Sequence, residues 1–243
     1  AGAPVVPSGA WGLAVGQVGE SWAVAANGQA VRVAVVDSGV RASDPELSGA
    51  LAPGYDFVAG AAVDAQAAAD PFGHGSAVAE VIGGRPGPTG EAVGICWWCT
   101  IIPVRVLDAS GSGNGDAIAA GIRWAADSGA RVINLSVVLN GSIPAVADAI
   151  VYAESHDVLV VAAAGNDASD TPSYPASYPG VVAVAAVDNT RSLYAWSRRG
   201  AWITLGAPGC SAVNGADFCG TSAAAAFVSG VAALAFAAKP SAS

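Results

Sequence analysis

Residues 31–37, VRVAVVD, form an almost continuous apolar run that ends in an acidic side chain. Such a run is typical of a strand that is covered on both faces of a sheet. Along the rest of the chain, runs of strand length alternate with segments of helical periodicity, which predicts an α/β fold: three layers, with a mainly parallel central sheet and helices on both faces. The predicted strands are 31–36, 101–107, 131–137, 158–164, 181–187 and 202–205, and the predicted helices are 75–82, 116–127, 143–156 and 223–238.

The composition excludes several classes of protein. Of the 243 residues, 53% are hydrophobic and 12% are charged. This composition excludes an intrinsically disordered chain, which needs low hydrophobicity and high charge. The formal net charge of −9 disfavours nucleic acid as a partner, because its backbone is also negative. The most apolar stretches, 158–164 and 223–238, are shorter than the ~20 residues of a membrane span, and we interpret the second as a buried helix. No linker or repeat divides the sequence, so we expect one domain over residues 1–243.

The cysteines indicate a secreted protein. Pairing of sequence neighbours, Cys96 with Cys99 and Cys210 with Cys219, would give two disulfides, which are typical of secreted proteins. The alternatives are a four-thiolate zinc site and a redox-active pair at 96–99. The chain contains no methionine, and its first residues lack the basic start and apolar core of a signal peptide. We therefore expect a processed, extracellular product.

Polar side chains come at the ends of apolar runs, where a parallel sheet places its functional groups. Asp37, Ser136 and Asn166 hold such positions. Taken singly, an Asp before Ser-Gly suits a turn, a His between glycines suits a structural cap, and a Ser before an alanine-rich run suits a helix N-terminus. Together, however, Asp37, His74 and Ser222 supply what serine catalysis requires: a hydroxyl, a base for its proton, and a carboxylate that orients the base.

Four strings of sequence resemble the signatures of the subtilisin-like serine peptidases, or subtilases. They are VAVVDSGV at 33–40, GHGSAVA at 73–79, AAGN at 163–166 and GTSAA at 220–224. The chain order Asp, His, Ser is the one found in subtilisin. The resemblance covers residues 11–238 and implies a subtilisin-like fold, serine endopeptidase activity, and a mature catalytic domain without its propeptide.

The resemblance also implies a role for each residue. Ser222 would attack the scissile carbonyl, His74 would accept its proton and return it to the leaving amine, and Asp37 would orient His74. The Asn166 side chain and the backbone N–H of Ser222 would bind the oxyanion. Two edge segments and the specificity pocket would bind substrate, through Gly111, Ser112, Gly113, Ser136, Val137, Val138, Ala163, Ala164, Gly165 and Ser173.

The sequence departs from the family at the pocket wall and at calcium-binding positions. Val138 stands where relatives commonly have Gly, and this branched side chain predicts a preference for small to medium apolar residues before the scissile bond, the P1 position. Thr204 stands where relatives place a cation-binding Asp, although Glu46 stays a candidate ligand. The chemistry requires no cofactor, structural calcium stays open, and we assign no metal site.

The implied partners are protein or peptide substrates and, in the precursor, a propeptide. We expect a monomer that does not bind nucleic acid and has no membrane span. Two alternative functions stay open beside general proteolysis. One is a selective processing peptidase for one dedicated partner protein, and the other is a catalytically silent subtilase fold that is used for binding.

Overall fold

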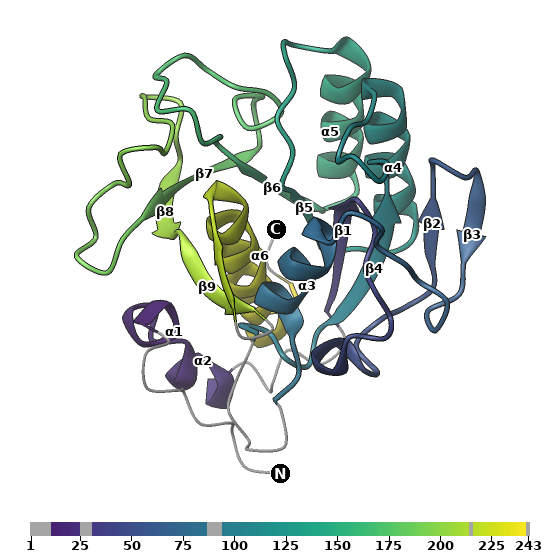
Figure 1. Ribbon diagram of the computed structural model, residues 1–243, viewed down its shortest axis with the longest axis horizontal. Helices are drawn as coiled ribbons and strands as arrows, with labels where there is room; N and C mark the ends of the chain where they lie inside the picture. The colour runs from purple at the N-terminus through teal and green to yellow at the C-terminus, as the bar shows by residue number, and fades with distance from the viewer. Residues whose placement is uncertain (1–10, 25–30, 87–93, 214–215, 242–243) are drawn as a thin grey trace.

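The computed structural model describes residues 11–24, 31–86, 94–213 and 216–241. Eight strands form its main sheet: β1 (Arg32–Asp37), β2 (Gly54–Asp56), β3 (Ala61–Val63), β4 (Thr100–Arg105), β5 (Val132–Leu135), β6 (Leu159–Ala163), β7 (Val182–Val187) and β8 (Leu205–Pro208). Their spatial order is β3-β2-β4-β1-β5-β6-β7-β8 (Figure 1). Neighbouring strands from β2 to β8 pair in parallel, whereas β3 runs antiparallel to β2. The predicted, mainly parallel sheet is confirmed.

Strand β1 lies in the middle of this sheet and is covered on both faces. It pairs with β4 on one side and with β5 on the other, so that Val33 lies beside both Ile101 and Val132. Val33 and Val35 belong to the hydrophobic core on one face, and the residues between and after them belong to the core on the opposite face. This double burial explains why the strand is an apolar run and does not alternate with polar residues.

Helices form the two outer layers (Figure 1). The described α-helices are α1 (Trp11–Val15), α2 (Val18–Val24), α3 (His74–Gly83), α4 (Gly115–Asp127), α5 (Pro144–Ser155) and α6 (Thr221–Ala238). Helices α4 and α5 contribute to the core on one face of the sheet, and α3 and α6 contribute to the core on the other. Helix α4 begins after Asn114, whose side chain accepts a 2.8 Å hydrogen bond from the N–H of Ala117. The three-layer arrangement is therefore as predicted.

Helix α6 is the central helix of its layer. Within the described residues it alone has the length and composition of a membrane span, with a mean hydropathy of 1.7, yet 61% of it is buried inside the protein. Its small side chains allow close packing: a Cβ at Gly230 would lie only 2.5 Å from the Cβ of Ile95. The prediction of a buried helix at 223–238 is confirmed. Packing in the core accounts for the apolar composition of this helix.

The last strand of the sheet differs from the prediction. A strand was expected at 202–205, but β8 begins only at Leu205 and continues to Pro208. It pairs with β7 alone, at the edge of the sheet, where a proline that lacks a donor N–H is tolerated. The sequence pattern also missed β2, β3 and the antiparallel hairpin of β9 (Cys210–Val213) and β10 (Ala216–Cys219), because these strands are too short for a clear periodicity.

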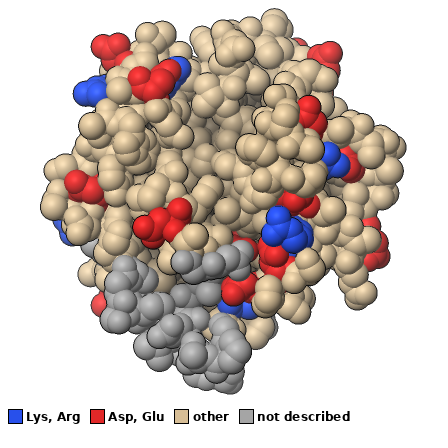
Figure 2. Space-filling view, viewed as in Figure 1, with Lys and Arg blue, Asp and Glu red and all other residues tan. Residues whose placement is uncertain are grey.

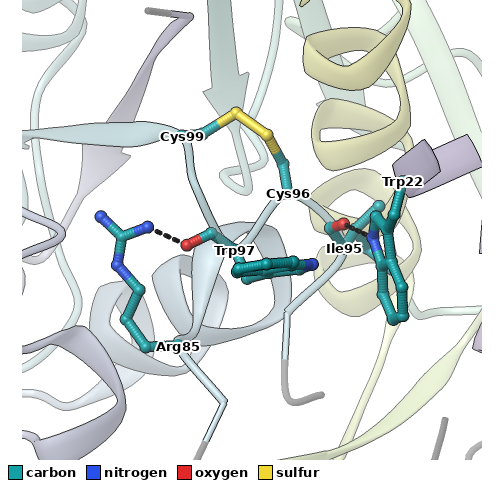
Figure 3. The surroundings of a disulfide bond; sticks show 6 residues. All are labelled: Trp22, Arg85, Ile95, Cys96, Trp97 and Cys99. Carbon is teal, nitrogen blue, oxygen red and sulfur yellow. Dashed lines mark hydrogen bonds between the residues drawn. A yellow bond between two sulfur atoms is a disulfide. The ribbon is translucent and has the colours of Figure 1, made fainter. Parts of the chain in front are cut away.

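Both expected disulfides are present, Cys96–Cys99 and Cys210–Cys219. The first is fully buried beside Trp22 and Trp97, whose rings meet edge to face at 6.3 Å (Figure 3). The indole N–H of Trp22 donates to the carbonyl of Ile95 at 2.7 Å, and the Arg85 guanidinium donates to the carbonyl of Trp97. All four cysteines are thus paired in disulfides, which excludes the four-thiolate zinc alternative. Full burial of Cys96 and Cys99 favours a structural disulfide over the redox-active pair, because a reactive cysteine has to be accessible.

Reduction of the Cys210–Cys219 disulfide should lower the melting temperature. This disulfide joins β9 to β10 across a sequence separation of 9, and a cross-link of this loop length stabilises a fold by roughly 2–3 kcal/mol. Mild reductant should release two thiols from the native protein, because Cys219 is exposed whereas Cys96 and Cys99 are buried. Thiol titration and thermal unfolding measure both effects. A double Cys210→Ser, Cys219→Ser variant whose melting temperature equals that of the wild type would contradict this expectation.

Candidate active site

Asp37 and His74 form a hydrogen-bonded pair at the C-terminal end of β1. Asp37 is the last residue of the strand and is fully buried. The Nδ1 atom of His74 lies 2.8 Å and 3.0 Å from the two carboxylate oxygens of Asp37. Because a carboxylate only accepts hydrogen bonds, Nδ1 carries a proton, and Nε2 is the acceptor in the neutral ring. The imidazole therefore presents a basic nitrogen on the side away from Asp37.

Two glycines allow this close approach. Gly73 precedes α3 with a φ of +92°, in the left-handed region that favours glycine. Gly75 packs directly against the chain that leaves β1: a Cβ there would lie 2.1 Å from the carbonyl oxygen of Gly39 and 3.1 Å from the Cβ of Asp37. Gly75 is thus required by the contact between the first turn of α3 and the end of β1, and Gly73 by its backbone conformation.

The environment of His74 favours its protonated form. Burial lowers the pKa of His74, but the hydrogen bond with Asp37 and the negative charges of Asp37 and Asp70 raise it, and the net pKa lies above the ordinary value of 6.5. If His74 accepts a proton, the neighbouring carboxylates therefore stabilise the imidazolium that forms.

Ser222 lies in the first turn of α6, two residues after Gly220, and is half-buried. Helix α6 packs against α3 (Figure 1). The ring of Phe218, just before this turn, contacts the His74 ring edge to face, with 5.5 Å between the ring centroids. No hydrogen bond joins the His74 ring to the Ser222 hydroxyl, although the structure describes both residues. Catalytic hydrogen bonds are often long without substrate and shorten in the complex.

Buried polar groups connect the start of α6 to the end of β5. The hydroxyl of Ser136 donates to the Ser222 carbonyl at 3.4 Å and accepts from the side-chain amide of Asn134 at 2.9 Å. The amide oxygen of Asn134 in turn accepts from the Ser229 hydroxyl at 3.0 Å. Asn134 was not singled out from the sequence, where its only signal is a polar residue inside an apolar run.

Asn166 lies opposite the start of α6, and its amide orientation is fixed. Its Oδ1 accepts two hydrogen bonds of 2.9 Å, from the N–H and the hydroxyl of Thr221. That hydroxyl also accepts from the N–H of Gly165 at 2.9 Å, and it donates to Asn166 because an amide oxygen only accepts. Because a backbone N–H can only donate, the oxygen of the amide faces Thr221 and the NH₂ group is left to point elsewhere. Asn166 is exposed, so this donor is accessible from solvent.

A cleft of about 350 Å³ opens beside His74. Six predicted substrate-binding residues line it: Gly111, Ser112, Gly113, Ser136, Val137 and Val138. Four further residues that the sequence did not indicate complete the lining: Phe72, Leu107, Ile118 and Leu139. Apart from the titratable ring of His74, no lining side chain carries a charge, and charged residues on the face shown in Figure 2 are scattered, without a continuous patch of one sign.

The other predicted binding residues, Ala163, Ala164, Gly165 and Ser173, do not line this cleft. They lie at the end of β6, where the Ser173 hydroxyl donates to the carbonyl of Ala164 at 2.6 Å. The segment that follows is tied to the cleft wall, because the N–H of Leu139 donates to the carbonyl of Tyr174 at 2.7 Å. The structure thus places these residues next to the cleft wall, close to Asn166.

Metal ligands are not gathered in the described part of the chain. Among those residues, no group of three or more His, Cys, Asp or Glu side chains is arranged to hold a metal ion. Glu46, the candidate ligand noted from the sequence, therefore has no such group around it.

Comparisons with a family model and with known proteins identify the same group of relatives. The model of the subtilase family matches residues 28–243. A thermophilic serine proteinase from Bacillus sp. (strain AK1) is 38% identical over 88% of this chain, which spans 54% of that relative's length. Thermitase from Thermoactinomyces vulgaris is 35% identical over 90% of this chain, which spans 78% of thermitase.

Solved structures agree with the sequence comparison. Sphericase superposes with a TM-score of 0.80 at 32% identity, over 89% of this chain and 80% of its own. A cold-adapted subtilisin-like serine proteinase has a TM-score of 0.75 at 34% identity, over 86% of this chain and 76% of its own. The relatives are serine proteinases and the fold is subtilisin-like, and the chain therefore belongs to the subtilase family.

Proposed function

We propose that this protein is a serine endopeptidase that hydrolyses peptide bonds through an acyl-enzyme, with Asp37, His74 and Ser222 as its catalytic triad. The observation that carries this proposal is the buried Asp37 carboxylate on Nδ1 of His74, 2.8 Å away, beside an uncharged cleft. The arrangement leaves Nε2 of His74 as the base. Hydrogen bonds from Ser136 and to Asn166 hold the start of α6, which carries Ser222, at the C-terminal end of the sheet.

The proton path follows from these roles. In the first step the Ser222 oxygen attacks the scissile carbonyl carbon while Nε2 of His74 takes the hydroxyl proton. His74 then gives this proton to the leaving amine as the C–N bond breaks and the acyl-enzyme forms. Water repeats the sequence on the acyl group, which restores the free hydroxyl. Asp37 keeps the proton on Nδ1 and stabilises the imidazolium at each stage, in accord with the raised pKa of His74.

The oxyanion would be bound by two donors. One is the Asn166 NH₂ group, whose orientation the Thr221 contacts fix, and the other is the backbone N–H of Ser222. The latter lies in the first turn of α6, where unpaired N–H groups and the helix dipole favour negative charge. Donors that are already in place stabilise the tetrahedral intermediate without reorganisation.

Substrate would bind as an extended strand between the segments 111–113 and 136–138, through backbone hydrogen bonds. The uncharged lining of the cleft favours apolar substrate side chains. Val138 is 47% exposed at the wall of this cleft, and its branched side chain narrows the space for the P1 residue. We therefore assign a preference for small to medium apolar P1 residues.

Replacement of Val138 by glycine should shift this preference toward larger residues. Removal of the isopropyl group widens the cleft, and differences of this size change kcat/KM ratios by roughly 10- to 200-fold. The measurement is kcat/KM for matched peptides with Ala, Leu or Phe at P1. Val58→Gly is a matched control, because Val58 is 48% exposed in a turn outside the cleft. A wild-type enzyme that already cleaves best after Phe or Tyr would overturn the assignment.

Covalent labelling and general proteolysis test the function itself. A fluorophosphonate should label the native protein once, at Ser222, and denatured casein should be degraded. Labelling without casein cleavage would favour the selective processing peptidase. If the native protein is neither labelled nor able to cleave casein, the proposed function is wrong, and the catalytically silent binding module becomes the favoured interpretation.

The wider setting is part of the same proposal. Residues 1–243 would act as a single catalytic domain, since one eight-stranded sheet and its two flanking cores organise the described part of the chain. Two disulfides and a family of proteolytic enzymes support an extracellular location and action on proteins or peptides. The proposal includes a monomeric state and a precursor with a propeptide. Catalysis in this family needs no cofactor, and structural calcium would bind outside the residues that carry the reaction.

A further inference from the structure

Asp70 is a buried carboxylate that the mechanism above does not use. It lies four residues before His74 and is 5% exposed. It forms no ion pair in the part of the chain that the structure describes. Burial of an unpaired charge is unfavourable unless hydrogen bonds satisfy it. The position of this charge beside the proposed base therefore requires a physical reason.

Hydrogen bonds converge on Asp70 from both sides of His74. Its Oδ1 accepts from the N–H groups of Phe72 at 3.2 Å and Gly73 at 2.8 Å, immediately before the histidine. Its Oδ2 accepts from the N–H and the hydroxyl of Ser76, at 2.8 Å and 2.7 Å, in the first turn of α3. One carboxylate thus holds the backbone on either side of the imidazole.

A further contact reaches the strand that carries Asp37. The hydroxyl of Ser38 donates to Asp70 at 2.8 Å and accepts from the N–H of Gly75 at 3.0 Å. The N–H of the same Ser38 donates to the Asp37 carboxylate at 2.7 Å. The network therefore links the two partners of the Asp37–His74 pair through short, buried hydrogen bonds.

The charge of Asp70 also acts on His74. Burial raises the pKa of Asp70, but hydrogen bonds from Ser76, Gly73 and Ser38 lower it more, so that it lies below 3.8 and the group is ionised at neutral pH. Together with Asp37, it raises the pKa of His74.

The other charged groups near this network are few. Arg41 donates to the backbone carbonyl of Asp70 at 3.4 Å and pairs with Asp44 at 3.2 Å. The short 3₁₀ helix at Pro45–Leu47, which packs on α3, carries Glu46, while α6 carries no charged side chain.

We propose that Asp70 is a positioning residue, which holds the His74 turn against the end of β1 so that the Asp37–His74 pair keeps one geometry through both proton transfers. This inference rests on the proposed peptidase function. It assigns a role to a residue outside the triad, one that touches neither substrate nor the reacting atoms.

The test is the isosteric variant Asp70→Asn. The NH₂ group of asparagine cannot accept hydrogen bonds. Depending on which way the amide faces, the variant loses either the hydrogen bonds from Ser76 or those from Gly73 and Ser38, and His74 shifts. Because a displacement of about 1 Å can reduce turnover ~100-fold, kcat should fall roughly 10- to 100-fold with KM nearly unchanged. Loss of the negative charge lowers the pKa of His74, so the acid limb of the kcat/KM profile should move to lower pH.

A second readout does not depend on activity. The chain has only two histidines, so NMR titration resolves the His74 ring, with His156→Gln for assignment. In Asp70→Asn the titration midpoint of His74 should fall. A role in stability alone would lower the melting temperature but leave kcat and this midpoint unchanged, and that result would overturn the proposal. If the wild type neither labels nor cleaves, the peptidase function fails, whereas the NMR shift still tests the link between Asp70 and His74.

Two further variants complete the experiment. Asp64→Asn is the matched control, because this exposed carboxylate only accepts from the N–H of Gln66 at 2.8 Å, and it should behave as wild type. Ser38→Ala keeps the hydrogen bonds that Asp70 accepts from Phe72, Gly73 and Ser76 but removes its connection to β1. It therefore carries the test if Asp70→Asn does not fold: its kcat should fall, and an unchanged kcat would overturn the proposal.

Discussion

Replacement of Ser222 by alanine should reduce kcat by roughly 10⁶-fold, a magnitude established for the nucleophile of subtilisin, a relative. The variant lacks the oxygen that forms the acyl bond, so the protein can no longer form its covalent intermediate. The remaining oxyanion donors and binding contacts would sustain only about 10³-fold acceleration over water. Ser222 is half-buried at the start of α6, and its hydroxyl forms no hydrogen bond within the part of the chain that the structure describes, so folding should be preserved.

The measurement combines fluorophosphonate labelling, peptide turnover and thermal unfolding. Ser155→Ala is the matched control, because the exposed Ser155 hydroxyl has only local partners at the end of α5: it donates to the carbonyl of Tyr152 at 2.7 Å and lies 3.2 Å from Nδ1 of His156. This control should label and turn over as the wild type does. A Ser222→Ala protein that still reacts with the fluorophosphonate would show that another residue is the nucleophile and would remove Ser222 from the mechanism.

Replacement of Asn166 by alanine should lower kcat by roughly 100- to 1000-fold with KM almost unchanged, a range that was also measured on subtilisin. The missing NH₂ donor stabilises charge that develops only in the transition state, so substrate binding is little affected. The melting temperature should change little, because Asn166 is exposed and water can replace its contacts with Thr221.

An isosteric variant separates catalysis from structure at this position. Asn166→Asp retains an oxygen that accepts from the N–H and hydroxyl of Thr221, but it offers no donor and adds a negative charge beside the oxyanion. It should therefore be at least as slow as Asn166→Ala while folding normally. Asn189→Ala, at an exposed turn, serves as control. Turnover of Asn166→Asp close to wild type would exclude the amide from the oxyanion site.

The sequence predicted the sheet well where burial is continuous. The run at 31–36 corresponds to β1 because both faces of a central strand are covered, which leaves an unbroken apolar pattern. At 202–205 the pattern was misplaced, since an edge strand that ends in Gly-Ala-Pro is paired on one side only and carries a weaker hydrophobic signal. Prediction from pattern was therefore strongest in the middle of the sheet and weakest at its edge and in its short hairpins.

The residues of the proposed site divide in a similar way. Asp37, His74, Asn166 and Ser222 could be singled out because each lies in a short string that resembles a subtilase signature, and because an Asp, a His and a Ser together supply what serine catalysis requires. Phe72, Leu107 and Leu139 carry no such local signal, and only the folded chain brings them to one cleft.

By itself, the sequence determined the alternation of buried strands and helices, the Gly-His-Gly turn and the chain order of the polar residues, because these depend on local periodicity and on backbone freedom. Only the tertiary structure decided which way the Asn166 amide faces, which rings border His74 and why a carboxylate is buried at Asp70. Each of these depends on hydrogen bonds or packing between segments that are separate in the chain, and their geometry exists only once the sheet and its helices have assembled.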